Sequence, residues 1–351
     1  MPTPVIASDA HLAHDGLIEL VRGAPVACYE SPARAVEIER ALRAAEGYAF
    51  EPPIGHGTAA ITAVHDAELV DLLEHAWTDA LAAGHDGRGP LIPDTFATEA
   101  FTARHELRGT PLSRFDRLGA YCFDTATPIV EGTYAAARAA VDVGLTAARR
   151  VLEGAPLAYG LCRPPGHHAG TRLFGGYCYF NNAAIVAQSL VDGGAARVAI
   201  LDVDYHHGNG TQQIFWERPD VLYVSLHGDP SGAYPYFSGY ASELGGGEGT
   251  GGNRNFPLAP RTDITGYAAA LREGLRLIAE FEPDAPLVLS LGFDTFERDP
   301  ISDLGLRTGD YQRVGAMIAE PGRPIIALQE GGYAIDAIGA NAVSFLAGLR
   351  G

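Results

Sequence analysis

Two adjacent histidines, His167 and His168, stand in the segment RPPGHHAG, where prolines and glycines interrupt regular structure. The prolines stiffen the backbone before the pair and Gly166 frees it again, so this loop can hold a side chain at a fixed place. Such loops often carry function. Because imidazole titrates near neutral pH, it can move protons during hydrolysis. We therefore interpret His167 and His168 as a candidate proton-transfer pair, with exposed loop residues as the alternative.

A second set of residues has the composition of a metal site. Asp204 and His206 lie two positions apart in DVDYHHGNG, at the end of an apolar run, so their side chains project to the same side. Asp294, in GFDTFE, follows another apolar run and can supply a third ligand. Two carboxylates and one imidazole leave a fourth position open, as catalytic Zn²⁺ requires, and Fe²⁺ can use the same ligands. Such a site polarises a carbonyl and activates water. A strand-end cap is the alternative role of Asp204.

Hydrolysis of an amide also needs groups that orient the imidazoles and stabilise an oxyanion. Asp202 and Asn209 lie in the same segment and can bind the second ring nitrogen of each histidine. Since Asn209 is neutral, its histidine should be less basic than one beside Asp202. Tyr333, in EGGYA, follows two glycines that allow close backbone approach, and its hydroxyl can donate to an oxyanion. Ordinary packing is the alternative for this tyrosine.

Two further tyrosines, Tyr177 and Tyr234, are flanked by glycine or proline and are candidates for the walls of a channel. Aromatic faces bury methylene groups and also attract a cationic amine, so such a channel suits a slender alkyl chain. Packing in the core is again the alternative.

The elements that position these residues follow from the apolar pattern. Apolar runs of strand length alternate with longer amphipathic stretches, the pattern of an α/β protein with a parallel sheet covered by helices on both faces. The predicted strands are 4–8, 157–162, 197–204, 221–227, 285–292 and 323–330. The predicted helices are 32–47, 66–84, 132–154, 181–194, 263–281 and 309–320. Residues 84–127 do not fit this rhythm and indicate a long insertion with little regular structure.

Polar residues follow the carboxyl ends of five of these strands, in LAYGLCRPPGHH, AILDVDYHHGNG, YVSLHGDP, VLSLGFDTFE and IALQEGGY. Ligands of open α/β sheets bind in the crevice beyond the carboxyl ends of the strands. The five segments are therefore expected to deliver Asp, His, Asn and Tyr side chains to one place.

Composition excludes several classes of function. The 351 residues carry a formal net charge of −18, which opposes binding to nucleic acid and permits a cationic small substrate. No apolar run reaches the ~20 residues of a membrane span, and the first residues lack the basic flank and apolar run of a signal peptide. The four cysteines are widely spaced, which predicts reduced thiols rather than disulfides. A cytoplasmic, single-domain protein over residues 1–351 is expected.

The segments RPPGHHAG, FGGYCYFNNAA, AILDVDYHHGNGTQ, VSLHGDP, GFDTFERDP and EGGY resemble, in order and spacing, the signature of the histone deacetylase and acetylpolyamine amidohydrolase family. The resemblance covers nearly the whole chain and is closest to the bacterial acetylpolyamine amidohydrolases. It implies that the metal ligands bind zinc, that the adjacent histidines are the family's tandem pair, and that Tyr333 polarises the carbonyl.

The resemblance also assigns residues that spacing alone does not. It implies that a substrate tunnel is formed by Gly176, Tyr177 and Tyr234. It implies that a structural K⁺ is held by Asp202, Asp204, His206, Ser225 and Leu226.

The fold implied by the resemblance is the single-domain arginase-deacetylase fold, with an eight-stranded parallel sheet and helices on both faces. In the polyamine branch the insertion before the tandem histidines forms a homodimer contact and narrows the entrance, so residues 84–127 are expected to do both. Acidic residues of that insertion help to select polyamines in the family; Asp116 and Asp124 are acidic here, but the resemblance assigns neither of them to a family acid.

The sequence therefore predicts a zinc-dependent amidohydrolase that deacetylates small acetylated amines such as acetylpolyamines, as a homodimer without nucleic-acid or membrane partners. A protein or peptide acetyl-lysine deacetylase is the alternative. An arginase-like ureohydrolase with two Mn²⁺ ions needs bridging carboxylates, but Gly208 and Phe296 stand where that class has aspartates. A non-catalytic ligand-binding protein would have no need of the full set of catalytic positions.

Overall fold

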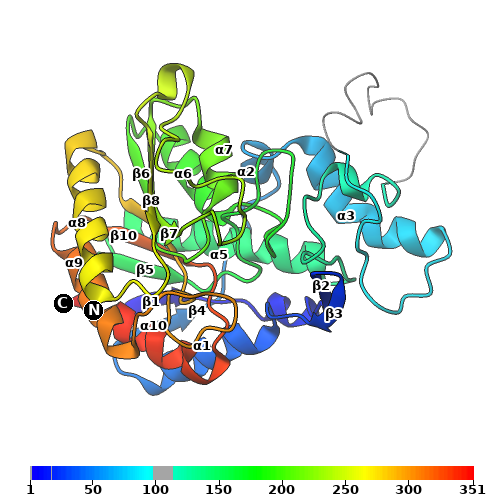
Figure 1. The fold of residues 1–351 in the computed structure, drawn as a ribbon, viewed down its shortest axis with the longest axis horizontal. Helices are drawn as coiled ribbons and strands as arrows, with labels where there is room; N and C mark the ends of the chain where they lie inside the picture. Colours follow the sequence, from blue (N-terminus) through cyan, green and yellow to red (C-terminus); the bar gives the residue numbers. More distant parts are fainter. Residues whose placement is uncertain (1, 17, 98–113) are drawn as a thin grey trace.

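The computed structural model describes residues 2–16, 18–97 and 114–351. In this part of the chain eight strands form one sheet in the order β4-β1-β5-β10-β9-β6-β7-β8, and all neighbouring strands run parallel (Figure 1). The strands are β1 (Thr3–Ile6), β4 (Tyr48–Glu51), β5 (Leu157–Gly160), β6 (Val198–Asp202), β7 (Val221–Gly228), β8 (Asn253–Leu258), β9 (Leu287–Leu291) and β10 (Ile325–Gln329). The predicted eight-stranded parallel sheet is confirmed.

Helices cover both faces of the sheet because its central strands are buried on both sides. Neighbouring strand residues alternate between two hydrophobic cores: Ile200 of β6 packs with residues of α3, α5 and α6, whereas Leu201 packs with residues of α1, α8, α9 and α10. Figure 1 shows α1 and α10 along the lower side of the molecule and α6 and α7 in its upper part. The helices are α1 (Pro32–Ala44), α2 (Ala59–Thr62), α3 (Ala67–Ala82), α5 (Thr133–Leu152), α6 (Asn182–Asp192), α7 (Asn209–Phe215), α8 (Ile264–Phe281), α9 (Thr308–Ala319) and α10 (Ile335–Arg350).

The strands predicted to carry the functional residues are neighbours in the sheet. β5, β10, β9, β6 and β7 lie side by side, so the five loops that follow them meet at one edge. A separate antiparallel hairpin, β2 (Ile18–Val21) and β3 (Ala24–Ala27), lies apart from the large sheet. β2 and the turn residue Arg22 line the pocket described below.

All six predicted strands and all six predicted helices are present, but the pattern missed several elements. β8 contains Asn253, Asn255 and Pro257, which strand patterns disfavour, and an edge position in the sheet tolerates them. β4 is the other edge strand and has only four residues. The hairpin and the helices α2, α7 and α10 were also missed, because glycines interrupt the apolar pattern around them.

The insertion at 84–127 has little regular structure where it is described. It contains a short 3₁₀ helix, η2 (Leu118–Ala120), and the isolated bridges of Leu91 to Ile129 and of Cys122 to Phe174. Residues 98–113 lie outside the described residues, so the homodimer contact stays a prediction. Within the described ranges, no helix combines the length and the apolar character that crossing a membrane demands.

A buried ion-pair network ties α1 to the loops at the carboxyl edge of the sheet. Glu30 Oε1 accepts hydrogen bonds from Arg34 Nη1 at 2.7 Å and from Arg163 Nε at 2.9 Å, and these side chains are at most 2 % exposed. Burial alone would raise the pKa of Glu30, but the two guanidinium groups outweigh burial and lower it. Arg163 begins the RPPGHH loop, and Arg34 also donates to the backbone oxygens of Glu330 and Gly332.

Removing one partner of a buried ion pair costs about 3–5 kcal/mol. We therefore expect Glu30→Gln, which leaves two buried guanidinium groups without a carboxylate, to lower the free energy of unfolding by about that amount in urea denaturation. Glu280→Gln, in the exposed pair with Arg276, is the matched control and should change it little. Equally small effects in both variants would contradict the role of the network.

Candidate active site and metal centre

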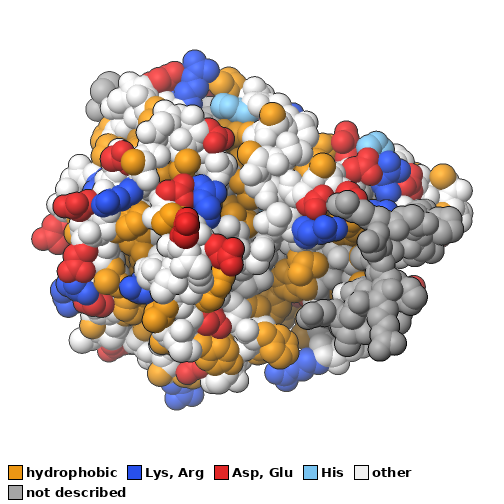
Figure 2. Space-filling view, turned by 90° about the horizontal axis from the view of Figure 1, so that it is seen from above, with side chains coloured by type: hydrophobic (Ala, Val, Ile, Leu, Met, Phe, Trp, Pro, Cys, Tyr) orange, Lys and Arg blue, Asp and Glu red, His pale blue; other side chains and the backbone are white. Residues whose placement is uncertain are grey.

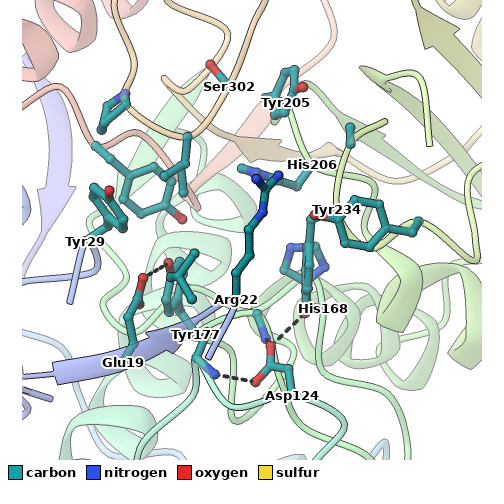
Figure 3. Close-up of a pocket in the computed structure, with 18 of the residues that line it drawn as sticks. Glu19, Arg22, Tyr29, Asp124, His168, Tyr177, Tyr205, His206, Tyr234 and Ser302 are labelled. Atoms are coloured by element: carbon teal, nitrogen blue, oxygen red, sulfur yellow. Dashed lines mark hydrogen bonds between the residues drawn. The ribbon is translucent and has the colours of Figure 1, made fainter. Parts of the chain in front are cut away.

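A pocket of about 700 Å³ lies at the carboxyl edge of the sheet, next to the β2-β3 hairpin. Its lining includes His168, His206 and Tyr333, which come from the loops after β5, β6 and β10. Tyr177 and Tyr234 form aromatic walls of the same pocket (Figure 3). Residues predicted separately for catalysis, metal binding and the tunnel therefore surround one cavity.

The tandem histidines are each oriented by the partner that was expected for them. His167 Nδ1 lies 3.1 Å from a carboxylate oxygen of Asp202, and His168 Nδ1 lies 2.7 Å from the side-chain oxygen of Asn209. Of the two, His168 lines the pocket, whereas His167 is 2 % exposed and lies 3.8 Å from Asp204. The adjacent rings thus occupy different places in the site.

The two imidazoles differ in proton affinity. Burial opposes protonation of His167, but the carboxylates of Asp202 and Asp204 raise its pKa to about 10. Burial, together with the neighbouring His167 and His206, lowers the pKa of His168 well below its ordinary value. At neutral pH His168 is therefore a neutral ring that can accept a proton, while His167 carries positive charge.

Glu330, which had no predicted role, binds the backbone of the histidine loop. The carboxylate of Glu330 accepts hydrogen bonds from the backbone N–H of Gly166 at 2.6 Å and of His167 at 3.2 Å, and from the Ser290 hydroxyl at 3.0 Å. Burial raises the pKa of Glu330 to about 7, against the opposing charge of His167. Glu330 belongs to the EGGY segment, but its contact with a distant loop leaves no local signal in the sequence.

Asp204, His206 and Asp294 meet in one cluster, and their ligand atoms all lie within 4.8 Å of one another. His206 Nδ1 lies 3.0 Å from Asp294 Oδ2 and 3.4 Å from Asp204 Oδ1. The backbone N–H of Tyr205 donates to Asp294 at 2.9 Å and that of Gly331 donates to Asp204 at 2.7 Å. These backbone bonds fix the two carboxylates from outside the cluster.

The charges of the cluster fit a metal ion. Asp204 and Asp294 are 0 % exposed and His206 is 6 % exposed. Burial and the charge of Asp204 raise the pKa of Asp294 to about 7, and the two carboxylates raise the pKa of His206 to about 10 despite burial. The cluster therefore attracts positive charge at the point that its donor atoms surround. Two carboxylates and an imidazole there match the donor set of a divalent metal such as Zn²⁺.

The surroundings of the cluster do not fit the two-metal alternative. A Cβ atom added to Gly208 would lie 2.4 Å from the Tyr223 hydroxyl oxygen and 2.6 Å from Asp202 Oδ2, so an aspartate has no room there. Phe296 is 3 % exposed and belongs to a hydrophobic core. Neither position can supply a bridging carboxylate.

Tyr333 faces the cluster across the pocket. Its ring centroid lies 6.5 Å from that of His206 and 5.7 Å from that of Tyr177. Its backbone N–H donates to Asp299 at 2.7 Å, and the Arg34 guanidinium lies 4.7 Å over its ring. Burial raises the pKa of Tyr333 well above its ordinary value, so the hydroxyl keeps its proton. Within the described residues this hydroxyl has no hydrogen-bond partner and can donate to a ligand.

The remaining predicted residues also lie near the cluster. Gly176 has a φ of 58°, and a Cβ atom added there would lie 2.2 Å from His168 Cδ2, so only glycine lets this wall pack on the histidine. Asp202 and Ser225 are paired in register between β6 and β7, and Leu226 follows Ser225 in β7. Three of the five residues assigned to potassium binding are therefore close neighbours in the sheet.

Two carboxylates of the pocket wall had no predicted role. Glu19, in β2, accepts a hydrogen bond from the Tyr177 hydroxyl at 3.1 Å, and burial raises its pKa to about 7. Asp124 accepts a hydrogen bond from the Tyr234 hydroxyl at 2.8 Å. Glu19 stands in an ordinary alternating stretch, IELV, which gives no sign of a pocket.

Known proteins are similar to this chain over nearly its whole length. Residues 28–349 match the histone deacetylase domain. The chain is 46% identical over 346 residues to acetylpolyamine amidohydrolase 1 of Pseudomonas aeruginosa, covering 99% of this chain and 98% of that one. It is 43% identical over 347 residues to acetylpolyamine amidohydrolase of Mycoplana ramosa, covering 99% of each. The crystal structure of an acetylpolyamine aminohydrolase from Burkholderia pseudomallei superposes with a TM-score of 0.92 at 38% identity, covering 99% of this chain and 98% of that one.

Replacing Asp294 by alanine leaves two of the three clustered donors. We expect Asp294→Ala to lose most of its bound metal, measured by elemental analysis after dialysis, while its circular dichroism spectrum stays native. Asp284→Ala is the control, because Asp284 caps backbone N–H groups at the opposite edge of the sheet. Full metal content in Asp294→Ala would exclude this residue as a ligand.

Proposed function

The chain belongs to the histone deacetylase family, and from this membership we propose that it removes acetyl groups from small acetylated amines, acetylpolyamines among them. Hydrolytic deacetylation is the chemistry of the family. The observation that carries the proposal is the placement of a neutral His168, the acidic cluster and the Tyr333 hydroxyl around one pocket with aromatic walls.

The proposed reaction assigns a task to each residue. When bound at the cluster, a divalent cation supplies Lewis acidity toward the acetyl carbonyl and the attacking water. His168, oriented by Asn209, accepts a proton from that water. Tyr333 donates its hydroxyl hydrogen to the carbonyl oxygen as negative charge develops there. His167, kept positive by Asp202, stabilises the same charge.

Product formation uses the proton that His168 has taken up. The protonated imidazole delivers it to the leaving nitrogen and the carbon–nitrogen bond breaks, which gives acetic acid and a free amine; one proton then passes from the acid to the amine, leaving acetate and an ammonium group. The water supplies the oxygen of the acetate, so atoms and protons balance without a further reactant.

The metals follow from the donor set. We assign Zn²⁺ to Asp204, His206 and Asp294, with Fe²⁺ as the second choice, because these donors do not discriminate strongly between divalent ions. We assign a structural K⁺ to the neighbourhood of Asp202, Ser225 and Leu226. The register of β6 and β7 supports this assignment.

The pocket supports a slender cationic substrate. The rings of Tyr177 and Tyr234 can bury methylene groups, and an ammonium group is attracted by the same faces. Glu19 lies in the wall next to Tyr177 and forms no ion pair within the described ranges. On the face drawn in Figure 2, acidic side chains are scattered among basic ones rather than gathered in one patch. The Glu19 carboxylate is therefore a better candidate for attracting the substrate's cation than the net charge of the chain, which salt screens at a distance.

The relatives named above support the same substrate class. Proteins 43% and 46% identical to this chain are named acetylpolyamine amidohydrolases. An acetyl-lysine peptide is the comparison substrate, because deacetylation of protein was the alternative expectation. A clear preference for acetylated peptide over N-acetylputrescine would overturn the substrate proposal and leave the deacetylase chemistry in place.

Removing the proposed proton acceptor should be severe. We expect His168→Ala to reduce kcat on N-acetylputrescine by ~10²–10⁴-fold. Tyr333→Phe should reduce it by ~10²–10³-fold, with a smaller change in KM, because the hydroxyl acts mainly in the transition state. His75→Ala, at a half-buried position on α3 outside the pocket, is the control and should match the wild type. Activity within a few-fold of wild type in His168→Ala would remove this residue from the mechanism.

The cation preference should depend on pH through Glu19. Because the folded chain raises the pKa of Glu19 to about 7, the carboxyl is charged above that pH and neutral below it. The ratio of kcat/KM for N-acetylputrescine to that for neutral N-butylacetamide should therefore fall as the pH drops below about 7. In this ratio, titrations of the enzyme that change kcat/KM equally for both substrates cancel.

Glu19→Gln should make this ratio low and independent of pH, and insensitive to ionic strength. Glu273→Gln, on the exposed surface of α8, is the matched control. A wild-type ratio that stays constant through the titration of Glu19 would show that this carboxylate does not select the cation.

A further inference from the structure

Asp124 lies between the two aromatic walls and binds both of them. Its Oδ2 atom accepts hydrogen bonds from the Gly176 backbone N–H at 2.7 Å and from the Tyr234 hydroxyl at 2.8 Å. Its Oδ1 atom accepts from the Ala126 backbone N–H at 3.2 Å and from the Thr127 hydroxyl at 2.8 Å. Figure 3 shows Asp124 next to Tyr177 and His168 in the pocket wall.

The wall at Tyr177 needs this support. Gly176 has a φ of 58° and Tyr177 a φ of 66°, so two consecutive residues adopt the left-handed region, which is strained for a tyrosine. Asp124 binds the N–H of Gly176, and the hydroxyl of Thr127 accepts the N–H of Tyr177 at 2.9 Å. Asp124 and Thr127, which donates its hydroxyl to Asp124, therefore hold the backbone N–H groups of both left-handed residues.

The wall at Tyr234 depends on the same segment. The Phe123 ring stacks on Tyr234 with centroids 6.4 Å apart, and the hydroxyl of Tyr234 donates to Asp124. On its other side Tyr234 meets the His168 ring edge to face at 5.1 Å. A shift of Asp124 would therefore move an aromatic wall that touches the proposed proton acceptor.

We propose that Asp124 is a positioning residue that fixes the separation of Tyr177 and Tyr234, and so the width of the tunnel through which the acetylated chain enters. The proposal rests on the proposed function, since it needs an acetylated substrate between the walls. A carboxylate has about four acceptor positions, and four donors of the chain occupy those of Asp124. Asp124 therefore does not act as the partner of the substrate's ammonium group, which separates its role from that of Glu19.

The test uses variants that change single groups. Tyr234→Phe removes the hydroxyl that donates a hydrogen bond to Asp124. Asp124→Asn keeps the side-chain volume, but an amide cannot accept all four hydrogen bonds that the carboxylate accepts. Each should lower kcat/KM on N-acetylputrescine by about tenfold, the order expected for one hydrogen bond to a charged group, mainly through KM. The double variant should be little worse than either single variant, because both break the same link.

Two controls match these changes. Tyr121→Phe removes a hydroxyl that donates to Glu68 at 2.8 Å outside the pocket, and Asp284→Asn alters a carboxylate that accepts backbone N–H groups far from it. Both should keep wild-type kinetics. Thermal melting of every variant verifies that the folded enzyme is compared.

Kinetics on a neutral substrate, and their dependence on salt, distinguish positioning of the tunnel walls from binding of the substrate's cation. If Asp124 positions the walls, Asp124→Asn loses the same factor on N-butylacetamide as on N-acetylputrescine and keeps the wild-type salt dependence. A loss confined to the cationic substrate, additive effects of the two substitutions, or lowered stability with unchanged kinetics would each overturn the proposal. The non-additive effect of Asp124→Asn and Tyr234→Phe can also be measured on an acetyl-lysine peptide. If the polyamine assignment is wrong, the enzyme will prefer the peptide, but the two substitutions will still be non-additive.

Discussion

Buried negative charge at the carboxyl edge of the sheet is the constraint on which the rest of the structure depends. Four carboxyl groups here are 0 % exposed: Asp202, Asp204, Asp294 and Glu330. A buried charge is stable only when it is paired or hydrogen-bonded. The fold meets this requirement with donors from several loops. Backbone N–H groups bind Asp204, Asp294 and Glu330, and His167 binds Asp202. The negative charge that these donors leave uncompensated lies around His206, where the proposed metal ion would balance it.

The same charges divide the work of the tandem histidines. His167 lies near two carboxylates and stays protonated, while His168, held by a neutral amide and close to two other imidazoles, stays neutral. Two other carboxyl groups, Glu19 and Asp124, lie in the pocket wall and bind its tyrosines. Burial raises the pKa of Glu19, which we propose attracts a cationic substrate, whereas the hydrogen bonds of Asp124 are all made within the chain. The proposed roles in proton transfer, recognition of substrate charge and tunnel shape thus belong to different carboxyl groups.

Sequence reasoning could predict whatever depends on local pattern. Periodicity identified the buried strands, and the polar residues after them indicated the site, because carboxyl ends of neighbouring parallel strands must meet. Edge strands such as β8 were missed, since half-exposed strands with Asn and Pro lack an apolar signature. Glu330, Asp299 and Glu19 were missed for another reason. Their partners are Gly166, Tyr333 and Tyr177, which lie far away in the sequence, so no spacing reveals them.

The most direct test of the account is a metal titration of the metal-free enzyme with N-acetylputrescine as substrate. Acetate release should rise linearly with added Zn²⁺ and level off at one equivalent per chain, because we assign a single ion to the cluster of Asp204, His206 and Asp294. Full turnover before any metal is added, or a rise that continues to two equivalents, would contradict the mononuclear metal site from which the proposed chemistry is derived.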